Sequence, residues 1–463
     1  MSETSQWNVI NPADESIFLT VEPTSELEIE AILARMRAAQ QDWCSVPVDV
    51  RVKVCGEFIG AFRAMKDKVA LDITRQMGKP LIQAMREVDT MLDRAETMLR
   101  LAPAALADDI LPPKEGFRRY IHREPLGIVL NIPAWNYPLL IAVNVIIPAL
   151  ATGNAVLIKH ARLTPLCGDA FVEAFRNTSL PPDLVASIHV THATIRKLID
   201  RRAVDFISFT GSVEGGRQVY EAASTKLIDM GLELGGKDPA FVCEDANFQY
   251  AMENTVDGAF YNAGQSCCAV ERVYVMRSIY RRFVDAYVAE VEKYKVGNPE
   301  REGVGIGPLA QAKAVEFMEY QVKDAVSRGA KVLTGGKRLP GPGYYFQPTV
   351  LVNVDHTMSV MMEETFGPLI GIMPVDTEDE AVRLMNDSPY GLTASIWTED
   401  IERGEALAAR TNAGTVYVNR CDYLDPELAW VGIKDSGHGC TLSHLGYQYL
   451  TRPKSFHLRV RTT

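Results

Sequence analysis

The stretch LGIVLNIPAWNYPLLIAVNVIIPALATGNAVLI, residues 126–158, decides the fold because it contains no charged residue. It begins with LGIVLNIP at 126–133 and runs into AVLIKH at 155–160, and both segments are short, branched and apolar, as buried β-strands are. The segment 139–150 between them has the length and apolarity of a buried helix. This order predicts two parallel strands joined by a right-handed crossover.

The same stretch is long enough to span a lipid bilayer. However, Pro133, Pro138 and Pro148 interrupt it, together with four asparagines. We therefore interpret it as the interior of an α/β domain.

The alternation of strand and helix continues beyond this stretch. Strands are predicted at 186–192, 204–212 and 226–236, with helices at 193–201 and 213–225. This pattern favours an open, doubly wound sheet in the first half of the chain.

A second α/β domain is predicted in the second half of the chain. The expected strands and helices there are 271–276, 279–295, 312–329, 331–336, 369–375 and 377–388. Glycine and proline cluster near 235–240, which favours a domain boundary there. Residues 116–127 and the final SFHLRVRTT alternate polar and apolar side chains, which predicts exposed strands and candidate contacts between subunits.

The composition narrows the class of protein. The chain has 463 residues, 47% of them hydrophobic and 23% charged, and a net charge of −11, which argues against nucleic acid or an anionic membrane as partner. The N-terminus has no basic or apolar region of a secretory signal, which favours the cytoplasm. The 8 cysteines form no Cys-x-x-Cys pair, so we predict no metal site and no disulfide framework.

A glycine–serine turn is the first candidate for chemistry. Gly211 and Ser212 lie between a predicted strand and a predicted helix, whose first turn would offer free N–H groups to a phosphate. The alternative is a turn with no ligand. The motif GVGIGP at 303–308 resembles a dinucleotide fingerprint, but Pro308 ends it and no strand precedes it, so we interpret it as a loop.

Two adjacent cysteines are the second candidate. Cys267 and Cys268 follow the turn NAGQS, and a glycine-rich turn at a helix start can lower a thiol pKa. The alternative is a pair of buried core thiols. A cysteine hydrolase would also need a histidine base, and none of the 8 histidines has a sequence neighbourhood that identifies one.

A carboxylate and an amide complete the candidates. Glu233 stands alone among apolar residues and glycines, where poor solvation would raise its pKa toward that of a usable base. Asn136 follows a predicted strand end between two prolines, where a fixed amide could stabilise an oxyanion. The alternative for Asn136 is a turn residue that binds its own backbone.

Eight motifs occur together in one order: PLGIVLNIPAWNYP, ATGNAVLIKH, FISFTGS, LELGGKDP, FYNAGQSCCA, EETFGPLIG, DSPYGLTASIWT and GIKDSGHG. On these motifs the chain resembles the aldehyde dehydrogenase superfamily over nearly its whole length. The later segments CDYLDPELAW and CTLSHLGYQYL resemble its semialdehyde dehydrogenase branch.

The resemblance implies an α/β fold of two doubly wound domains with a small β oligomerisation element. The implied ranges are 1–114 and 128–235 for binding NAD(P), 236–440 for catalysis, and 115–127 and 441–463 for assembly into a homodimer or homotetramer. The implied reaction is NAD(P)-dependent oxidation of an aldehyde to a carboxylic acid through a thiohemiacetal and a thioester on cysteine. The substrate could be a semialdehyde such as succinate semialdehyde.

The resemblance also implies the roles of individual residues. Cys267 would be the nucleophile, Glu233 the general base, and Asn136 a donor to the oxyanion. The implied NAD or NADP site consists of Ile132, Trp135, Lys159, Arg162, Gly211, Ser212, Gly216, Leu234, Glu364 and Phe366. Within it, Lys159 and Glu364 would hold the riboses. The alternatives are a coenzyme A-acylating dehydrogenase and a catalytically silent structural protein on the same fold.

Two positions depart from the family pattern. Arg162 stands where relatives often have a ribose-binding glutamate, and an arginine could attract the 2′-phosphate of NADP unless it points to solvent. Asn144 stands eight residues after Asn136, where succinate-semialdehyde dehydrogenases often have an arginine for the substrate carboxylate. This second departure weakens an assignment to acidic semialdehydes without removing it.

Overall fold

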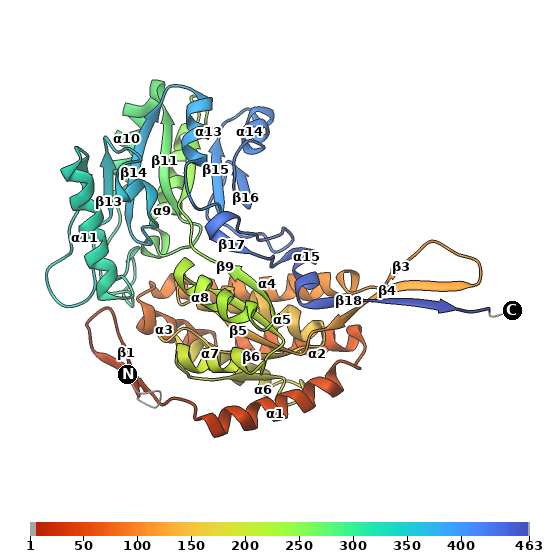
Figure 1. The fold of residues 1–463 in the computed structure, drawn as a ribbon. Coiled ribbons are helices and arrows are strands. Elements are labelled where there is room, and N and C mark those ends of the chain that lie inside the picture. The colour runs from red at the N-terminus through yellow and green to blue at the C-terminus, as the bar shows by residue number, and fades with distance from the viewer. Residues whose placement is uncertain (1–5, 462–463) are drawn as a thin grey trace.

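Two sheets, one of six strands and one of seven, form the two halves of the protein (Figure 1). This computed structural model describes residues 6–461. The first five residues of the predicted 1–114 segment and the last two of 441–463 therefore lie outside the described residues. The α/β fold class predicted from the sequence is confirmed.

The six-stranded sheet has the order β17-β9-β8-β5-β6-β7. Its strands are β5 (Ile128–Ile132), β6 (Ala155–Ile158), β7 (Val185–Ser187), β8 (Phe206–Thr210), β9 (Asp229–Glu233) and β17 (Gly437–His438). The first five are parallel, whereas β17 pairs antiparallel with β9. The edge strand β17 therefore comes from near the C-terminus, whereas the other five strands lie in the first half of the chain.

Eight helices accompany this sheet in the first half of the chain. They are α1 (Glu26–Trp43), α2 (Val48–Arg63), α3 (Lys66–Met77), α4 (Leu81–Ala105), α5 (Pro138–Ala151), α6 (Pro165–Arg176), α7 (His192–Asp200) and α8 (Val213–Ser224). Every residue of β5 and β6 is buried, as expected for parallel strands covered on both faces. Helix α5 begins at Pro138, whose fixed φ suits a first helical position, and no helix among residues 6–461 could cross a membrane.

The seven-stranded sheet has the order β12-β13-β14-β11-β10-β15-β16 and is parallel except at the β12–β13 pair. Its strands are β10 (Asp238–Val242), β11 (Val270–Met276), β12 (Lys331–Thr334), β13 (Thr349–Val352), β14 (Leu369–Val375), β15 (Thr393–Trp397) and β16 (Thr415–Val418). The helices of this half are α9 (Phe248–Phe260), η1 (Tyr261–Gly264), α10 (Arg277–Val291), α11 (Ala312–Ser327), α12 (Ser359–Met362), α13 (Glu378–Asn386) and α14 (Ile401–Ala408).

A narrow arm extends from the six-stranded half (Figure 1). It is a three-stranded antiparallel sheet of β3 (Asp109–Ile110), β4 (Phe117–Pro125) and β18 (Thr451–Arg459). The two exposed strands predicted from the sequence therefore pair with each other. The chain reaches β18 through η2 (Lys434–Ser436), β17 and α15 (Ser443–Tyr449), and a hairpin of β1 (Trp7–Ile10) and β2 (Ile17–Val21) lies near the N-terminus.

Most predicted elements appear within a few residues of their predicted limits. The predicted helix at 139–150 is confirmed by α5, and the loop at 303–308 contains no strand. Several predicted strands are shorter than expected, and the largest differences are at 186–192, 204–212 and 226–236, where the observed strands are β7, β8 and β9. The division into domains stays a prediction.

Candidate active site

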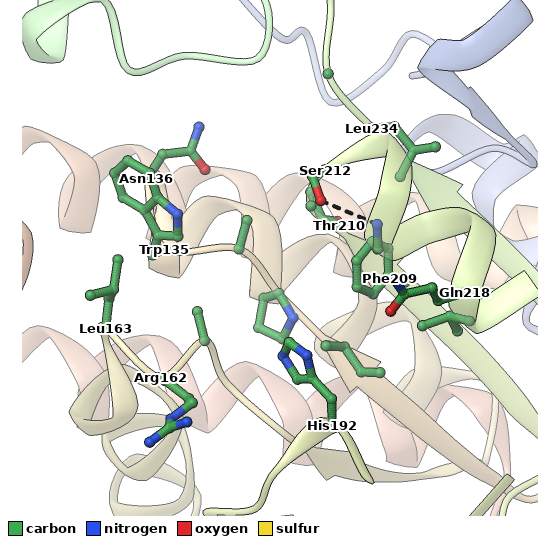
Figure 2. A pocket seen from close by; sticks show the side chains of 18 of the residues that line it. Trp135, Asn136, Arg162, Leu163, His192, Phe209, Thr210, Ser212, Gln218 and Leu234 are labelled. Atoms are coloured by element: carbon green, nitrogen blue, oxygen red, sulfur yellow. Dashed lines mark hydrogen bonds between the residues drawn. The ribbon is translucent and has the colours of Figure 1, made fainter. Parts of the chain in front are cut away.

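A cleft of about 1110 Å³ lies at the carboxyl ends of β5, β6 and β8. Figure 2 shows Asn136 and Trp135 on one side of this cleft, Ser212 and Phe209 on the other, and Arg162 at the lower end. Carboxyl ends of parallel strands are where open α/β sheets bind ligands. The second half of the chain contributes further lining residues, which are Cys267, Gln311, Lys313, Ala314, Phe317, Glu364, Thr365 and Phe366.

The loop that carries Cys267 has an unusual backbone. Asn262, Ala263 and Gly264 all have positive φ, at 53°, 55° and 70°. Non-glycine residues avoid this left-handed region unless other contacts hold them there. Asn262 supplies such contacts, because its side-chain amide donates to the backbone oxygens of Asn136 and Gln265, at 3.2 and 3.1 Å.

Asn136 is buried and directed at the same loop. Its Nδ2 donates one hydrogen bond, to the backbone oxygen of Gln265 at 3.2 Å. An amide nitrogen carries two hydrogens, so one N–H remains for a ligand. The alternative of a turn asparagine bound to its own backbone is not what the structure shows.

The two adjacent cysteines have different surroundings. Cys267 is half-buried and lines the cleft, whereas Cys268 is buried, with its Sγ 3.1 Å from Asp422 Oδ1. A hydrogen bond shared with Cys267, together with burial, raises the pKa of Cys268 well above its usual value. Cys268 therefore stays a thiol, and Cys267 is the thiol that a ligand in the cleft can reach.

Glu233 ends β9 next to the cleft, although it is not among the residues that line it. Burial raises the pKa of Glu233 above its ordinary value, while hydrogen bonds from Thr441 and Thr210 oppose that rise. Thr210 Oγ1 lies 3.3 Å from Glu233 Oε2, and Thr441 donates to the other oxygen. A carboxyl group with a raised pKa is suited to accept a proton from water.

A buried carboxylate fixes the start of α5, just after Asn136. Glu87 Oε1 accepts the backbone N–H groups of Leu139 and Leu140, at 2.9 and 3.4 Å. Its other oxygen pairs with Lys79, and both side chains are almost completely enclosed. Glu87 thus caps the helix that positions the amide of Asn136.

The ribose end of the predicted cofactor site is basic. Lys159 is 3% exposed, and its amine donates to none of the residues that the structure describes, so it remains available to ribose hydroxyls. Burial, with a smaller contribution from Arg162, lowers the pKa of Lys159 to about 8. The Arg162 guanidinium lies over the ring of Trp7, at 4.6 Å from its centre, and Arg162 lines the cleft.

The turn after β8 fits a phosphate. Ser212 caps α8 by accepting the backbone N–H of Gly215 at 3.2 Å, as the dashed line in Figure 2 marks. A Cβ at Gly211 would lie 2.7 Å from the ring of Phe209, so a larger residue there would have to displace that ring. Gly216 faces Leu234 rather than the cleft, and Gly215 is the helix glycine that lines it.

The nicotinamide end of the predicted site is formed by Glu364 and Phe366. Burial and repulsion from Glu271 raise the pKa of Glu364 to about 8, and Oε1 accepts the N–H of Gly236 at 3.1 Å. Phe366 meets Trp135 edge to face, with ring centres 5.5 Å apart. Of the predicted cofactor residues, all but Gly216 line the cleft. The residues present therefore fit a dinucleotide.

Sequence reasoning missed several residues that line the cleft. They are Pro133, Ala134, Ala161, Leu163, His192, Ala193, Ile195, Arg196, Ile199, Phe209, Thr210, Gly215, Gln218, Val219, Glu221, Ala222, Gly235, Gln311, Lys313, Ala314, Phe317 and Thr365. Some of these residues, such as Pro133 and Thr210, are sequence neighbours of predicted site residues. Their position at or just after the end of a predicted strand could have identified them. For Gln311 and Phe317 the sequence held no such signal.

Three comparisons place these observations among known proteins. The aldehyde dehydrogenase family profile matches residues 1–456. The chain is 32% identical to succinate semialdehyde dehydrogenase Sad of Escherichia coli over 94% of both proteins, and 32% identical to betaine aldehyde dehydrogenase of Bacillus subtilis over 96% of this chain and 93% of that protein. A crystal structure of betaine aldehyde dehydrogenase from Staphylococcus aureus with NAD+ matches at a TM-score of 0.94 and 29% identity, over 99% of this chain and 92% of that one.

Proposed function

Because the chain belongs to the aldehyde dehydrogenase family and is an enzyme that uses NAD or NADP, we propose that Cys267, Asn136 and Glu233 oxidise an aldehyde to its carboxylic acid. The observation that carries these roles is the cleft itself. The half-buried thiol of Cys267 and the fixed amide of Asn136, which has one unused N–H, both line this cleft, which is large enough for a dinucleotide.

The first step is attack on the aldehyde carbon. The Cys267 thiolate forms a carbon–sulfur bond, and the carbonyl oxygen becomes an oxyanion. The unused N–H of Asn136 and the backbone N–H of Cys267 stabilise that charge. Loss of one such donor typically reduces the rate about 100- to 1000-fold.

The second step removes hydride from the same carbon and leaves a thioester on Cys267. NAD or NADP, when bound in the cleft, supplies the hydride acceptor. Lys159 and Glu364, which line the cleft, would hold the riboses of the cofactor, and Phe366 would lie beside its nicotinamide.

The third step hydrolyses the thioester. Glu233 takes a proton from a water molecule, which attacks the thioester carbon and releases the acid and the Cys267 thiol. The raised pKa of Glu233 supports this role. Water as the acceptor distinguishes this enzyme from a coenzyme A-acylating dehydrogenase, and the intact site argues against a silent structural protein.

The substrate we propose is a semialdehyde, which agrees with the semialdehyde-like segments near the C-terminus. We further propose that the enzyme acts in the cytoplasm as a homodimer or homotetramer. Exposed edges of the arm, including Ile110, Leu458 and Val460, would provide contacts between subunits.

The experiment is absorbance at 340 nm with a panel of aldehydes, each tested with NAD and with NADP, and with and without coenzyme A. We expect reduced cofactor without coenzyme A. Turnover that requires coenzyme A, or no turnover with any aldehyde, would contradict the proposal.

A further inference from the structure

A buried ion pair joins the segments that carry the proposed base and the nucleophile. Lys237 Nζ donates to Glu271 Oε2 at 2.7 Å, and the two side chains are 0% and 6% exposed. Lys237 stands four residues after Glu233, and Glu271 stands four residues after Cys267. The pair therefore connects two strands, β10 and β11, at the ends that face the site.

The same pair holds a third segment, the loop between α12 and β14. Glu271 Oε2 accepts the backbone N–H of Thr365 at 2.8 Å, and Oε1 accepts that of Phe366 at 2.9 Å. Lys237 Nζ also donates to Thr365 Oγ1 at 2.8 Å. This loop contributes Glu364, Thr365 and Phe366 to the cleft, so one buried carboxylate fixes the backbone of the nicotinamide end.

The conformation of the loop depends on these hydrogen bonds. Phe366 has a φ of 51°, in the left-handed region that residues other than glycine avoid unless their surroundings hold them there. Its own N–H is the group that donates to Glu271. Without that acceptor, the backbone at Phe366 would lose the contact that opposes its return to a commoner conformation.

The three segments also touch through their backbones. A Cβ at Gly236 would lie 2.8 Å from the backbone oxygen of Cys267, so the two chains are in close contact there. On its other side, the N–H of Gly236 donates to Glu364 Oε1 at 3.1 Å. The backbone of Gly236 thus separates the nucleophile from the carboxylate that would hold the cofactor ribose.

The ion pair rests on a fixed base rather than on a mobile loop. Arg272 Nε donates to the backbone oxygen of Lys237 at 2.9 Å. The other nitrogens of Arg272 reach the backbone oxygens of Leu384 and Met385, at 3.3 and 3.1 Å. Lys237 is therefore held from below, and the position of the loop follows from the position of the pair.

We propose that Glu271, held by Lys237, is a positioning residue for hydride transfer, which sets the place of Glu364 and Phe366 relative to Cys267. This inference rests on the proposed function and adds to it a residue that lines no part of the cleft. Hydride would leave the carbon bound to Cys267 for the cofactor ring beside Phe366. A misplacement of about 1 Å between reacting groups can cost about 100-fold in rate, so this pair can control the step without touching either reactant.

The first test is equilibrium binding, which needs no turnover. NADH has the nicotinamide and its ribose, whereas ADP has neither. In Glu271→Gln a single oxygen remains for two backbone N–H groups, so Kd for NADH should rise about tenfold while Kd for ADP changes less than about twofold. The control is Glu363→Gln, on an exposed residue of the same loop that does not line the cleft, and it should change neither value.

The second test separates hydride transfer from the other steps on Cys267. In a single turnover with the aldehyde that is oxidised fastest, Glu271→Gln should slow the NADH burst about 10- to 100-fold, and deuterium on the aldehyde carbon should slow it further. Hydrolysis of 4-nitrophenyl acetate would acylate and deacylate Cys267 without any hydride transfer. Its rate should change less than about threefold, because Glu233 is held by Thr441 and Thr210 rather than by the pair.

Folding of the variant is controlled separately. Glu271→Gln leaves Lys237 buried without its counter-charge, which destabilises a protein. The double variant Lys237→Met/Glu271→Gln removes that charge, so it should unfold at a higher temperature than the single variant and still show the losses in NADH binding and hydride transfer. In the unchanged enzyme without cofactor, the amides of Thr365 and Phe366 should exchange with deuterium at least about 100-fold more slowly than in an unstructured peptide, and this needs no variant to fold.

The outcomes that overturn the inference are distinct from those that overturn the proposed function. The inference fails if the folded variants bind NADH as the unchanged enzyme does, or if ester hydrolysis falls together with hydride transfer. It also fails if the two amides exchange freely before the cofactor binds. Absence of cofactor reduction by the unchanged enzyme with every aldehyde would instead overturn the proposed function.

Discussion

Replacing Arg162 by glutamate should shift cofactor choice from NADP toward NAD. Arg162 lines the cleft together with Lys159, and its guanidinium is held over the Trp7 ring. From that place it can donate to a 2′-phosphate, which only NADP carries. A glutamate there would repel the same group.

The size of the change in cofactor preference depends on how far Arg162 is exposed to solvent. A charge-assisted hydrogen bond contributes about 1.5–3 kcal/mol when enclosed, and partial exposure reduces this toward about 1 kcal/mol. Replacing attraction by repulsion of similar size gives about 2 kcal/mol, or roughly a 30-fold fall in the ratio of kcat/KM for NADP to that for NAD. Arg162→Gln should produce about half of this free-energy change.

The pH dependence of KM for the cofactor is a second, independent measure of the interaction between Arg162 and the cofactor site. The pKa of Lys159 is about 8, lowered by burial and by Arg162. Its ammonium is present below that pKa and is lost above it, so KM for the cofactor should rise as pH increases through about 8. Arg162→Glu removes the repelling charge and adds an attracting one, so this rise should move to higher pH.

The assay is initial rate at 340 nm with both cofactors, from pH 6.5 to 9.5. Arg217→Glu is the control, because Arg217 is exposed, pairs with Asp435 and does not line the cleft. An unchanged cofactor ratio in Arg162→Glu, with an unchanged pH profile, would refute the reasoning.

Three other predictions concern Cys267, Glu233 and Glu87. Cys267→Ala should abolish NADH formation, whereas Cys268→Ala should retain it, because only the first thiol lines the cleft; the reverse result would show that the wrong cysteine was chosen. Glu233→Gln should leave a rapid burst of NADH followed by slow turnover in a stopped-flow experiment, and in the unchanged enzyme kcat should fall as pH drops through the raised pKa of Glu233. Loss of the burst would assign Glu233 to an earlier step. Glu87→Gln should lower kcat about tenfold and reduce the unfolding temperature, because it leaves Lys79 buried without its counter-charge. A lower unfolding temperature with an unchanged kcat would limit Glu87 to a structural role.

The local pattern of the sequence was enough to predict the strand–helix–strand core. Residues 128–132 and 155–158 are apolar except for Asn131, because parallel strands are covered on both faces. Helix α5 followed from the same stretch, and its predicted limits differ from the observed ones by one residue at each end.

The partners of the site residues could not be predicted in this way. Thr441 lies 208 residues from Glu233, and Trp7 lies 155 residues from Arg162. Such contacts depend on how distant segments pack, and no periodicity in the sequence records them. The contact between the Arg162 guanidinium and the Trp7 ring, beside the cleft, is one such contact.

The pairing of β17 with β9 bears on how the protein is made. A ribosome releases the chain from its N-terminus, so residues 437–438 emerge after every strand of the seven-stranded sheet. Until then β9 has an open edge, and Glu233 lacks the hydroxyl of Thr441. A nascent chain can therefore complete the second sheet before the first. Glu233 therefore reaches its final surroundings only after Thr441 has been synthesised and has folded against it.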